Sequence, residues 1–147
     1  MTVSQTLPDV IQEITINAPA TKVFDALTDP DQLPQWWGED GIYHVRKMER
    51  DLKVGGTWRS TGDGADGKPF AVEGVYRVID RPRVLEYTWN YDWAEKPAET
   101  IVRFDLSESG GKTRVRVTHS GFKDQAARDS HGEGWKTVLI WLSGFLQ

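Results

Sequence analysis

Apolar and polar residues alternate along seven stretches of this chain, and that pattern is typical of β-strands with one buried and one exposed face. The alternation is clearest in residues 84–91, where Leu85, Tyr87 and Trp89 share one face. Glycine-rich turns such as residues 62–67 separate neighbouring stretches, as expected for hairpins. The alternating stretches, with a loop around Lys96 and Pro97 before the sixth, are residues 10–16, 42–51, 57–61, 70–80, 84–91, 100–107 and 113–119.

Two short helices are predicted directly after the first strand. Pro19 suits the first turn of a helix, because its missing N–H is not needed there. Asp29 and Pro30 repeat this signal, with Asp29 as the N-cap. The second of these helices is expected to end near residues 36–38.

A long C-terminal helix is predicted from apolar residues at helical spacing. Ser130 and Glu133 form a candidate capping box at its start. The order of elements is therefore one strand, two short helices, about six strands and one long helix. Consecutive strands joined by short turns imply an antiparallel meander, so we expect one α+β domain over residues 1–147. The apolar stripe of the last helix comprises Trp135, Val138, Leu139, Leu142, Phe145 and Leu146.

The composition is that of a globular domain. Apolar residues make up 38% and charged residues 27% of the chain, which argues against a disordered segment. The net charge of -4 disfavours nucleic acid as a partner, because binding to phosphates requires basic surface. No apolar run is long enough to span a membrane, and residues 1–16 lack the pattern of a secretory signal, so we expect a cytoplasmic location. The chain contains no cysteine, which excludes disulfides and thiolate metal sites.

Several short motifs follow one another along the chain. They are Ile14-Thr15-Ile16-Asn17-Ala18-Pro19, Trp36-Trp37-Gly38, Gly55-Gly56-Thr57-Trp58, Tyr87-Thr88-Trp89 and His119-Ser120-Gly121-Phe122. In this order they resemble the START/Bet v 1-like (SRPBCC) superfamily, and most closely the bacterial proteins similar to the C-terminal domain of the activator of the heat-shock protein 90 ATPase. The resemblance implies a helix-grip fold, in which a curved antiparallel sheet of about six or seven strands wraps around the long helix and leaves a cavity. It does not fix a reaction, because the superfamily includes lipid carriers, hormone receptors, polyketide cyclases and chaperone activators.

Seven tryptophans are many for 147 residues, and a large indole ring gains by burial. On the implied fold, aromatic and apolar residues of the inward strand faces and the last helix would line the cavity, with Trp37 near its mouth. Ligand sites are typically concave and mostly apolar, so we expect binding of a small apolar, aromatic or lipid-like molecule. The expected ligand-binding residues are Trp37, Trp58, Phe70, Tyr76, Tyr87, Trp89, Phe104, His119, Trp135 and Leu139.

His119 is the candidate for a polar contact, because it shares a strand face with Val115 and Val117. It would anchor a ligand or act as an acid or base, or it would be a buried histidine bonded to a backbone carbonyl. The sequence shows no nucleophile–base pair and no metal-ligand spacing such as His-x-x-x-His, so we name no catalytic residue, cofactor or metal. A cyclase- or hydrolase-type enzyme and a module that contacts a chaperone stay open as alternative functions.

The orientation of the strand at residues 70–80 is left open by its pattern, because both of its faces carry apolar residues. Glu73 and Arg77 therefore point either into the cavity or to water. Glu86 is out of phase with Leu85 and Tyr87, which predicts a carboxylate on the outer face of the sheet.

Overall fold

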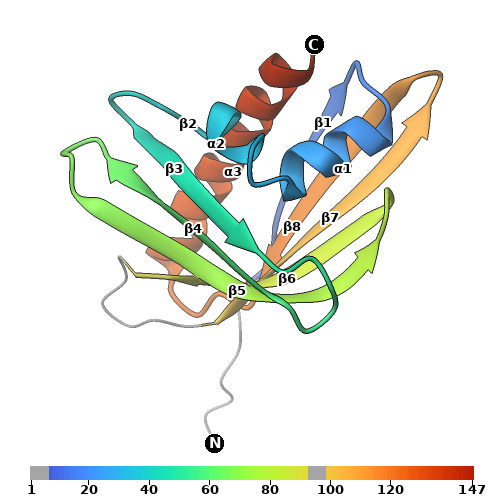
Figure 1. Cartoon of the computed structure of the whole chain (residues 1–147). Coiled ribbons are helices and arrows are strands. Elements are labelled where there is room, and N and C mark those ends of the chain that lie inside the picture. The colour runs from blue at the N-terminus through green and yellow to red at the C-terminus, as the bar shows by residue number, and fades with distance from the viewer. Residues whose placement is uncertain (1–6, 93–98) are drawn as a thin grey trace, which may run out of the picture.

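The computed structural model describes residues 7–92 and 99–147. In this part of the chain, eight strands form one antiparallel sheet in the order β1-β8-β7-β6-β5-β4-β3-β2, with β1 and β2 at opposite edges. The sheet bends into an open half-barrel, and the helices lie on its concave side (Figure 1). The elements are β1 (Val10–Ile16), α1 (Ala20–Thr28), α2 (Leu33–Trp36), β2 (Gly38–Glu39), β3 (Tyr43–Arg50), β4 (Thr57–Gly64), β5 (Pro69–Asp80), β6 (Val84–Tyr91), β7 (Thr100–Ser109), β8 (Lys112–Ser120) and α3 (Gln125–Leu146).

The predicted α+β class and the curved sheet around a C-terminal helix are confirmed. Each of the seven predicted strands is present, with ends that differ by a few residues. The additional strand β2 has only two residues, which is too short for an alternating pattern to reveal it. The predicted loop around Lys96 and Pro97 lies outside the described residues.

Irregular pairing in two long strands accounts for the bend of the sheet. The register shifts at residues 45–47 of β3 and at residues 76–78 of β5, and such bulges increase the local twist and bend. Gly74 in β5 also permits a close approach of two strands, because a Cβ there would lie 1.9 Å from the carbonyl oxygen of Thr88. Because the sheet bends in this way, its concave face leaves space beside α3.

The start of α3 differs from the sequence prediction. The helix begins at Gln125, and its N-cap Asp124 accepts a hydrogen bond from the backbone N–H of Ala127 at 2.9 Å. The predicted start at Ser130 is therefore wrong. Residues 125–133 are exposed or half-buried, so the apolar stripe that indicates the helix does not extend over its first turns.

The predicted role of Asp29 is also wrong. Asp29 ends α1, where its backbone N–H bonds to the carbonyl oxygen of Asp25, and the N-cap of α2 is Gln32. The Asp29 carboxylate instead accepts the backbone N–H of Asp31 at 2.9 Å. An aspartate that follows a helix and precedes a turn therefore stabilises the turn between the two short helices.

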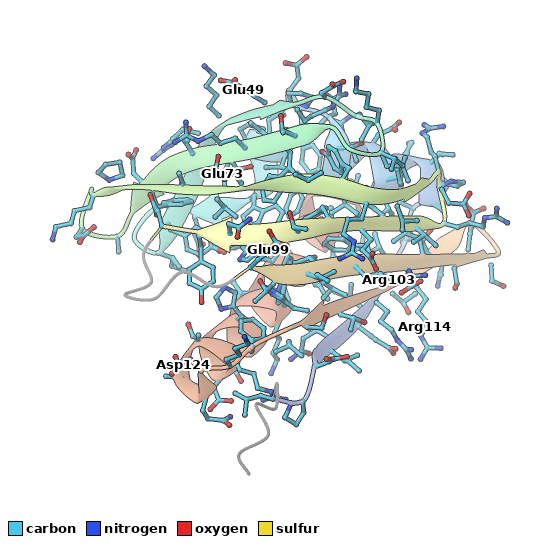
Figure 2. The ribbon with its side chains drawn as sticks, turned by 90° about the horizontal axis from the view of Figure 1, so that it is seen from below. Glu49, Glu73, Glu99, Arg103, Arg114 and Asp124 are labelled. Carbon is cyan, nitrogen blue, oxygen red and sulfur yellow. The ribbon has the colours of Figure 1, made fainter. Side chains whose placement is uncertain are left out.

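The two faces of the sheet differ in polarity, and the convex face carries charged side chains. Figure 2 looks onto this face and shows Glu73, Arg103 and Arg114 spread across it. Glu73 and Arg77 are both exposed, which places both outside the cavity and settles the orientation that the sequence left open. Glu86 lies on the convex face as expected, but it is half-buried between Arg77 and Arg103, each with a nitrogen 3.5 Å from its carboxylate.

Candidate functional site

A cavity of about 560 Å³ lies between the concave face of the sheet and α3. Ligand pockets in proteins typically enclose about 300–1,000 Å³, so this space suits a small molecule. The wall is mostly apolar, and six of the predicted ligand-binding residues belong to it. These are Trp37, Trp58, Phe70, Tyr87, Trp89 and Trp135.

The other four predicted residues lie behind this wall. Tyr76 and Phe104 are buried and pack against Tyr87, with ring centroids 6.1 and 6.2 Å away. Leu139 of α3 and His119 of β8 are likewise buried in the core. The strands that supply described wall residues are β3, β4, β5 and β6, whereas the main contact of α3 with the sheet is at β1. The helix therefore fills one side of the half-barrel with core and leaves the cavity on the other side.

Trp89 is at the centre of a cluster of aromatic rings. Its ring centroid lies 5.4 Å from that of Trp135, 5.8 Å from Trp58 and 6.3 Å from Trp37. Tyr87 packs edge-to-face against Trp58 at 4.9 Å. Such pairs contribute about 0.5–1.5 kcal/mol each beyond the burial of their area, so the rings hold one another in place. Trp37, which was expected near the mouth, is buried within this cluster.

His119 is part of a buried chain of hydrogen bonds that links α3 to the sheet. The indole N–H of Trp135 donates to His119 Nδ1 at 2.9 Å, so the single proton of the neutral ring is on Nε2. This Nε2–H lies 2.7 Å from Thr100 Oγ1 and donates to it. The Thr100 hydroxyl in turn donates to the backbone carbonyl oxygen of Trp89 at 3.0 Å. Each donor in this chain therefore has an acceptor.

The imidazole of His119 is neutral at pH 7. Burial, and secondarily the nearby His131, lowers the pKa of His119 to about 2. A second proton on Nδ1 would also face the N–H of Trp135, and two donors cannot bond to each other. The sequence left open whether His119 contacts a ligand or substrate or is a buried structural histidine, and this geometry has the features of the second. Its hydrogen-bond partners are the side chains of Trp135 and Thr100 rather than the expected backbone carbonyl.

A comparison with known families agrees with this arrangement of sheet, helix and cavity. The family model described as activator of Hsp90 ATPase homolog 1-like protein matches residues 17–147. The chain belongs to this family. The resemblance inferred from the sequence motifs is thereby confirmed. No curated protein matches the chain in sequence.

Solved structures of bacterial proteins share the fold of this family member. Protein CV1439 from Chromobacterium violaceum superposes with a TM-score of 0.82 at 21% identity, over 94% of this chain and 96% of that one. The AHSA1 protein from Silicibacter pomeroyi superposes with a TM-score of 0.76 at 26% identity, over 93% of this chain and 96% of that one. CalU16 from Micromonospora echinospora superposes with a TM-score of 0.74 at 24% identity, over 95% of this chain and 76% of that one. These similarities establish the helix-grip architecture and leave the ligand open.

The set predicted by sequence lacks the polar wall residues Ser60, Ser130 and His131. His131 lies one helical turn before Trp135, so the shared helix face is the signal that could have found it. Its Nδ1–H donates to the carbonyl oxygen of Ala127 at 2.8 Å, and burial lowers the pKa of His131 although this bond acts in the opposite direction. Ser60 is two residues beyond Trp58 in β4 and therefore faces the same way.

Further apolar wall residues are also missing from the predicted set. Several belong to segments whose inward orientation depends on the bend of β3 and on the path of the short helices, and this is not visible in a local pattern. The additional apolar and aromatic wall residues are Leu27, Leu33, Tyr43, Val45, Met48, Pro69, Val72 and Val138.

Charged wall residues gather at one end of the cavity. Among the described wall residues, those with a formal charge at neutral pH are Asp66 and Lys68 of the β4–β5 hairpin and Asp92 after β6. All three are exposed, so this end is the mouth. The Asp92 carboxylate also accepts the backbone N–H of Ala71 at 3.0 Å, which holds the end of β6 against β5. A ligand would thus pass a polar rim and reach an uncharged interior.

The described part of the chain contains no group of three or more His, Asp or Glu side chains that could hold a metal ion. Within the same residues, no helix is long and apolar enough to cross a membrane. The cytoplasmic location expected from the sequence stays a prediction.

Proposed function

We propose that this protein binds a small apolar or aromatic molecule in the cavity between strands β3 to β6 and α3. The observation that carries the proposal is a cavity of about 560 Å³ with a wall formed largely by aromatic rings. Concave, mostly apolar sites with a few polar groups are typical of small-molecule binding. The predicted residues behind the wall would support its rings rather than touch the ligand; these are Tyr76, Phe104, His119 and Leu139.

The distribution of charge supports a ligand that is largely uncharged. Asp66, Lys68 and Asp92 are at the exposed mouth, and the interior wall carries no further formal charge among its described residues. Transfer of an unpaired ion from water into such an interior costs several kcal/mol. An apolar body that enters the cavity and leaves any charge at the rim fits this arrangement.

The two alternative functions stay predictions without a specific observation in their favour. An enzyme that uses His119 as acid or base would need a ring nitrogen free for the substrate, yet both nitrogens bond to protein groups. The name of the family refers to an activator of Hsp90 ATPase, and a chaperone contact of this chain would have to be sought by co-purification.

A pair of glycines in α3 provides the test of cavity binding. Gly134 lines the cavity, and a Cβ added there would meet nothing within 4 Å. The substitution Gly134→Leu should place its side chain in the cavity and weaken binding at least about tenfold, because a cavity group and a ligand would compete for one space. The matched control is Gly144→Leu, at an exposed position of the same helix that is equally open and outside the cavity wall. Both changes replace glycine by a better helix former.

Binding is measured by isothermal titration calorimetry and tryptophan fluorescence with a panel of hydrophobic compounds that includes fluorene. A ligand at about 100 times its Kd should raise the free energy of unfolding by about 2.7 kcal/mol, which corresponds to a Tm increase of about 5–10 °C for a chain of this size. The proposal would be wrong if no compound gave heat, quenching or a Tm change, or if Gly134→Leu bound as well as Gly144→Leu.

A further inference from the structure

Two indole N–H groups in the cavity wall have no hydrogen-bond partner among residues 7–92 and 99–147. Trp58 of β4 and Trp89 of β6 are 6% and 7% exposed, and their ring centroids are 5.8 Å apart. The Nε1 atom of each is buried and bonds to no atom of the described residues. A buried donor without an acceptor is unfavourable by about 1–3 kcal/mol, and such groups are uncommon in folded proteins. Their presence side by side in one wall therefore requires an explanation.

Other buried tryptophans of the same protein do find acceptors. Trp135 donates to His119 Nδ1 at 2.9 Å, and Trp36 donates to the carbonyl oxygen of Ala26 at 3.0 Å. The fold therefore supplies acceptors to other buried indole donors, including that of Trp135, which itself lines the cavity. The two donors without an acceptor among the described residues also belong to rings that line the cavity, but both Nε1 atoms are buried beneath the surface of its wall. Each ring would have to turn for an oxygen of a bound molecule to supply the acceptor.

The surroundings of these donors determine the charge of the acceptor. The charged wall residues Asp66, Lys68 and Asp92 are at the exposed mouth, and no arginine or further lysine is present among the described wall residues. A carboxylate or phosphate buried beside the two indoles would lack a cation. A neutral carbonyl oxygen has two lone pairs and can accept both N–H groups without that penalty.

We propose that the cavity selects a neutral aromatic or polycyclic molecule that carries a carbonyl oxygen, and that this oxygen accepts hydrogen bonds from Nε1–H of Trp58 and Trp89. This inference rests on the proposed function and adds the chemical class of the ligand. The flat body of the molecule would pack against the rings of the wall. The carbonyl would fix its orientation.

Fluorene and 9-fluorenone test the inference, because they share a ring skeleton and differ by one carbonyl oxygen. Calorimetric titration of the whole protein should give a Kd for 9-fluorenone about tenfold lower than for fluorene, as expected for one net hydrogen bond. The anion fluorene-9-carboxylate should bind more weakly than 9-fluorenone, because its charge would be buried without a cation.

The variants Trp58→Phe and Trp89→Phe identify the donors. Each keeps an aromatic ring and removes the N–H, so each should still bind fluorene and should lose most of the preference for 9-fluorenone. The matched control is Trp135→Phe, since the Trp135 N–H is in the same wall but already bonds to His119. This control should keep the preference even if its affinity for both compounds changes.

The indole N–H signals of the ¹⁵N-labelled wild-type protein give a second readout that does not depend on the stability of a variant. The signals of Trp58 and Trp89 should move downfield with 9-fluorenone and not with fluorene. Two results would overturn the carbonyl inference while the proposed function stands. One is equal affinity of the wild-type protein for the two compounds. The other is a preference for 9-fluorenone that survives in a variant carrying both Trp58→Phe and Trp89→Phe. Binding of neither compound below about 1 mM would overturn both.

Discussion

Two groups of buried polar atoms in one aromatic cluster differ in their hydrogen bonding. Around His119, both imidazole nitrogens, the Trp135 indole and the Thr100 hydroxyl all have partners. The ring of Trp89 lies only 5.7 Å from that of His119, yet the indole N–H groups of Trp89 and Trp58 have no partner in the described residues. Both groups contribute rings to the cavity wall, but only the first joins α3 to the sheet through hydrogen bonds.

The difference separates a structural role from a binding role for buried polar groups. A paired network inside a protein strengthens the contact between the elements that it joins. An unpaired donor weakens the fold unless another molecule supplies the acceptor. We therefore expect substitutions in the network around His119 to act on stability, and substitutions of Trp58 and Trp89 to act mainly on ligand preference.

The largest effect is expected from His119→Ala, which removes the centre of the paired network. The substitution leaves the Trp135 N–H and the Thr100 hydroxyl with unmet hydrogen bonds and opens a cavity in the core. The free energy of unfolding should fall by about 3–5 kcal/mol, measured by urea denaturation. The control His44→Ala removes a half-buried ring whose Nε2 lies 3.1 Å from the Pro34 carbonyl oxygen, and it should cost about 1 kcal/mol. A similar fall in the free energy of unfolding in both variants would show that the network around His119 stabilises the fold no more than an ordinary partly buried histidine does.

The pH dependence of stability tests the role of the buried His119 network in the unaltered protein. The pKa of His119 is about 2 in the folded protein, against an unfolded value of 6.5. The unfolded chain therefore binds more protons below pH 6.5, and stability must decrease as the pH falls. His119 alone should lower the free energy of unfolding by about 2 kcal/mol between pH 7 and pH 5, and His131, whose pKa burial also lowers, acts in the same direction. The variant His119→Gln should show a shallower pH dependence than the wild type, and an unchanged slope would contradict the assignment.

The smallest of these effects is a difference between two tryptophan substitutions in the absence of ligand. Trp135→Phe and Trp58→Phe remove the same atoms from buried positions, but only Trp135→Phe breaks a hydrogen bond. Trp135→Phe should therefore destabilise the protein by about 1–2 kcal/mol more than Trp58→Phe. Urea denaturation of both variants measures the difference, and equal losses would show that the Trp58 indole is paired in solution.

Much of the sheet could be predicted from the sequence, because a strand with one buried face shows its orientation in local alternation. Leu85, Tyr87 and Trp89 of β6 are buried as that alternation predicts. The start of α3 could not be predicted in the same way, because residues 125–133 are exposed or half-buried and lack an apolar stripe. The two-residue strand β2 is too short to show any period.

The candidate site was predictable only in part. Alternation places Trp58 and Phe104 on inward faces, but it does not distinguish a residue of the cavity wall from one of the core. That distinction depends on the side of the half-barrel at which α3 packs. His131 and Ser60 were missed for a related reason. Each shares a face with a predicted wall residue, but each is polar and so does not belong to the apolar pattern that indicates an inward face.

The sequence by itself determined the family, the order of the elements apart from β2, and the inward orientation of aromatic side chains such as Trp58, Tyr87 and Trp89, because these depend on spacing along the chain. Only the tertiary structure decided which of those side chains meet the cavity and which of their polar atoms are paired. Trp58 and Trp135 are chemically identical and both line the cavity. The indole N–H of Trp135 lies 2.9 Å from an acceptor on β8, and that of Trp58 has no acceptor within bonding distance in the described residues. Hydrogen bonding requires a particular distance and direction between atoms far apart in sequence, and only the packing of α3 on the curved sheet sets them.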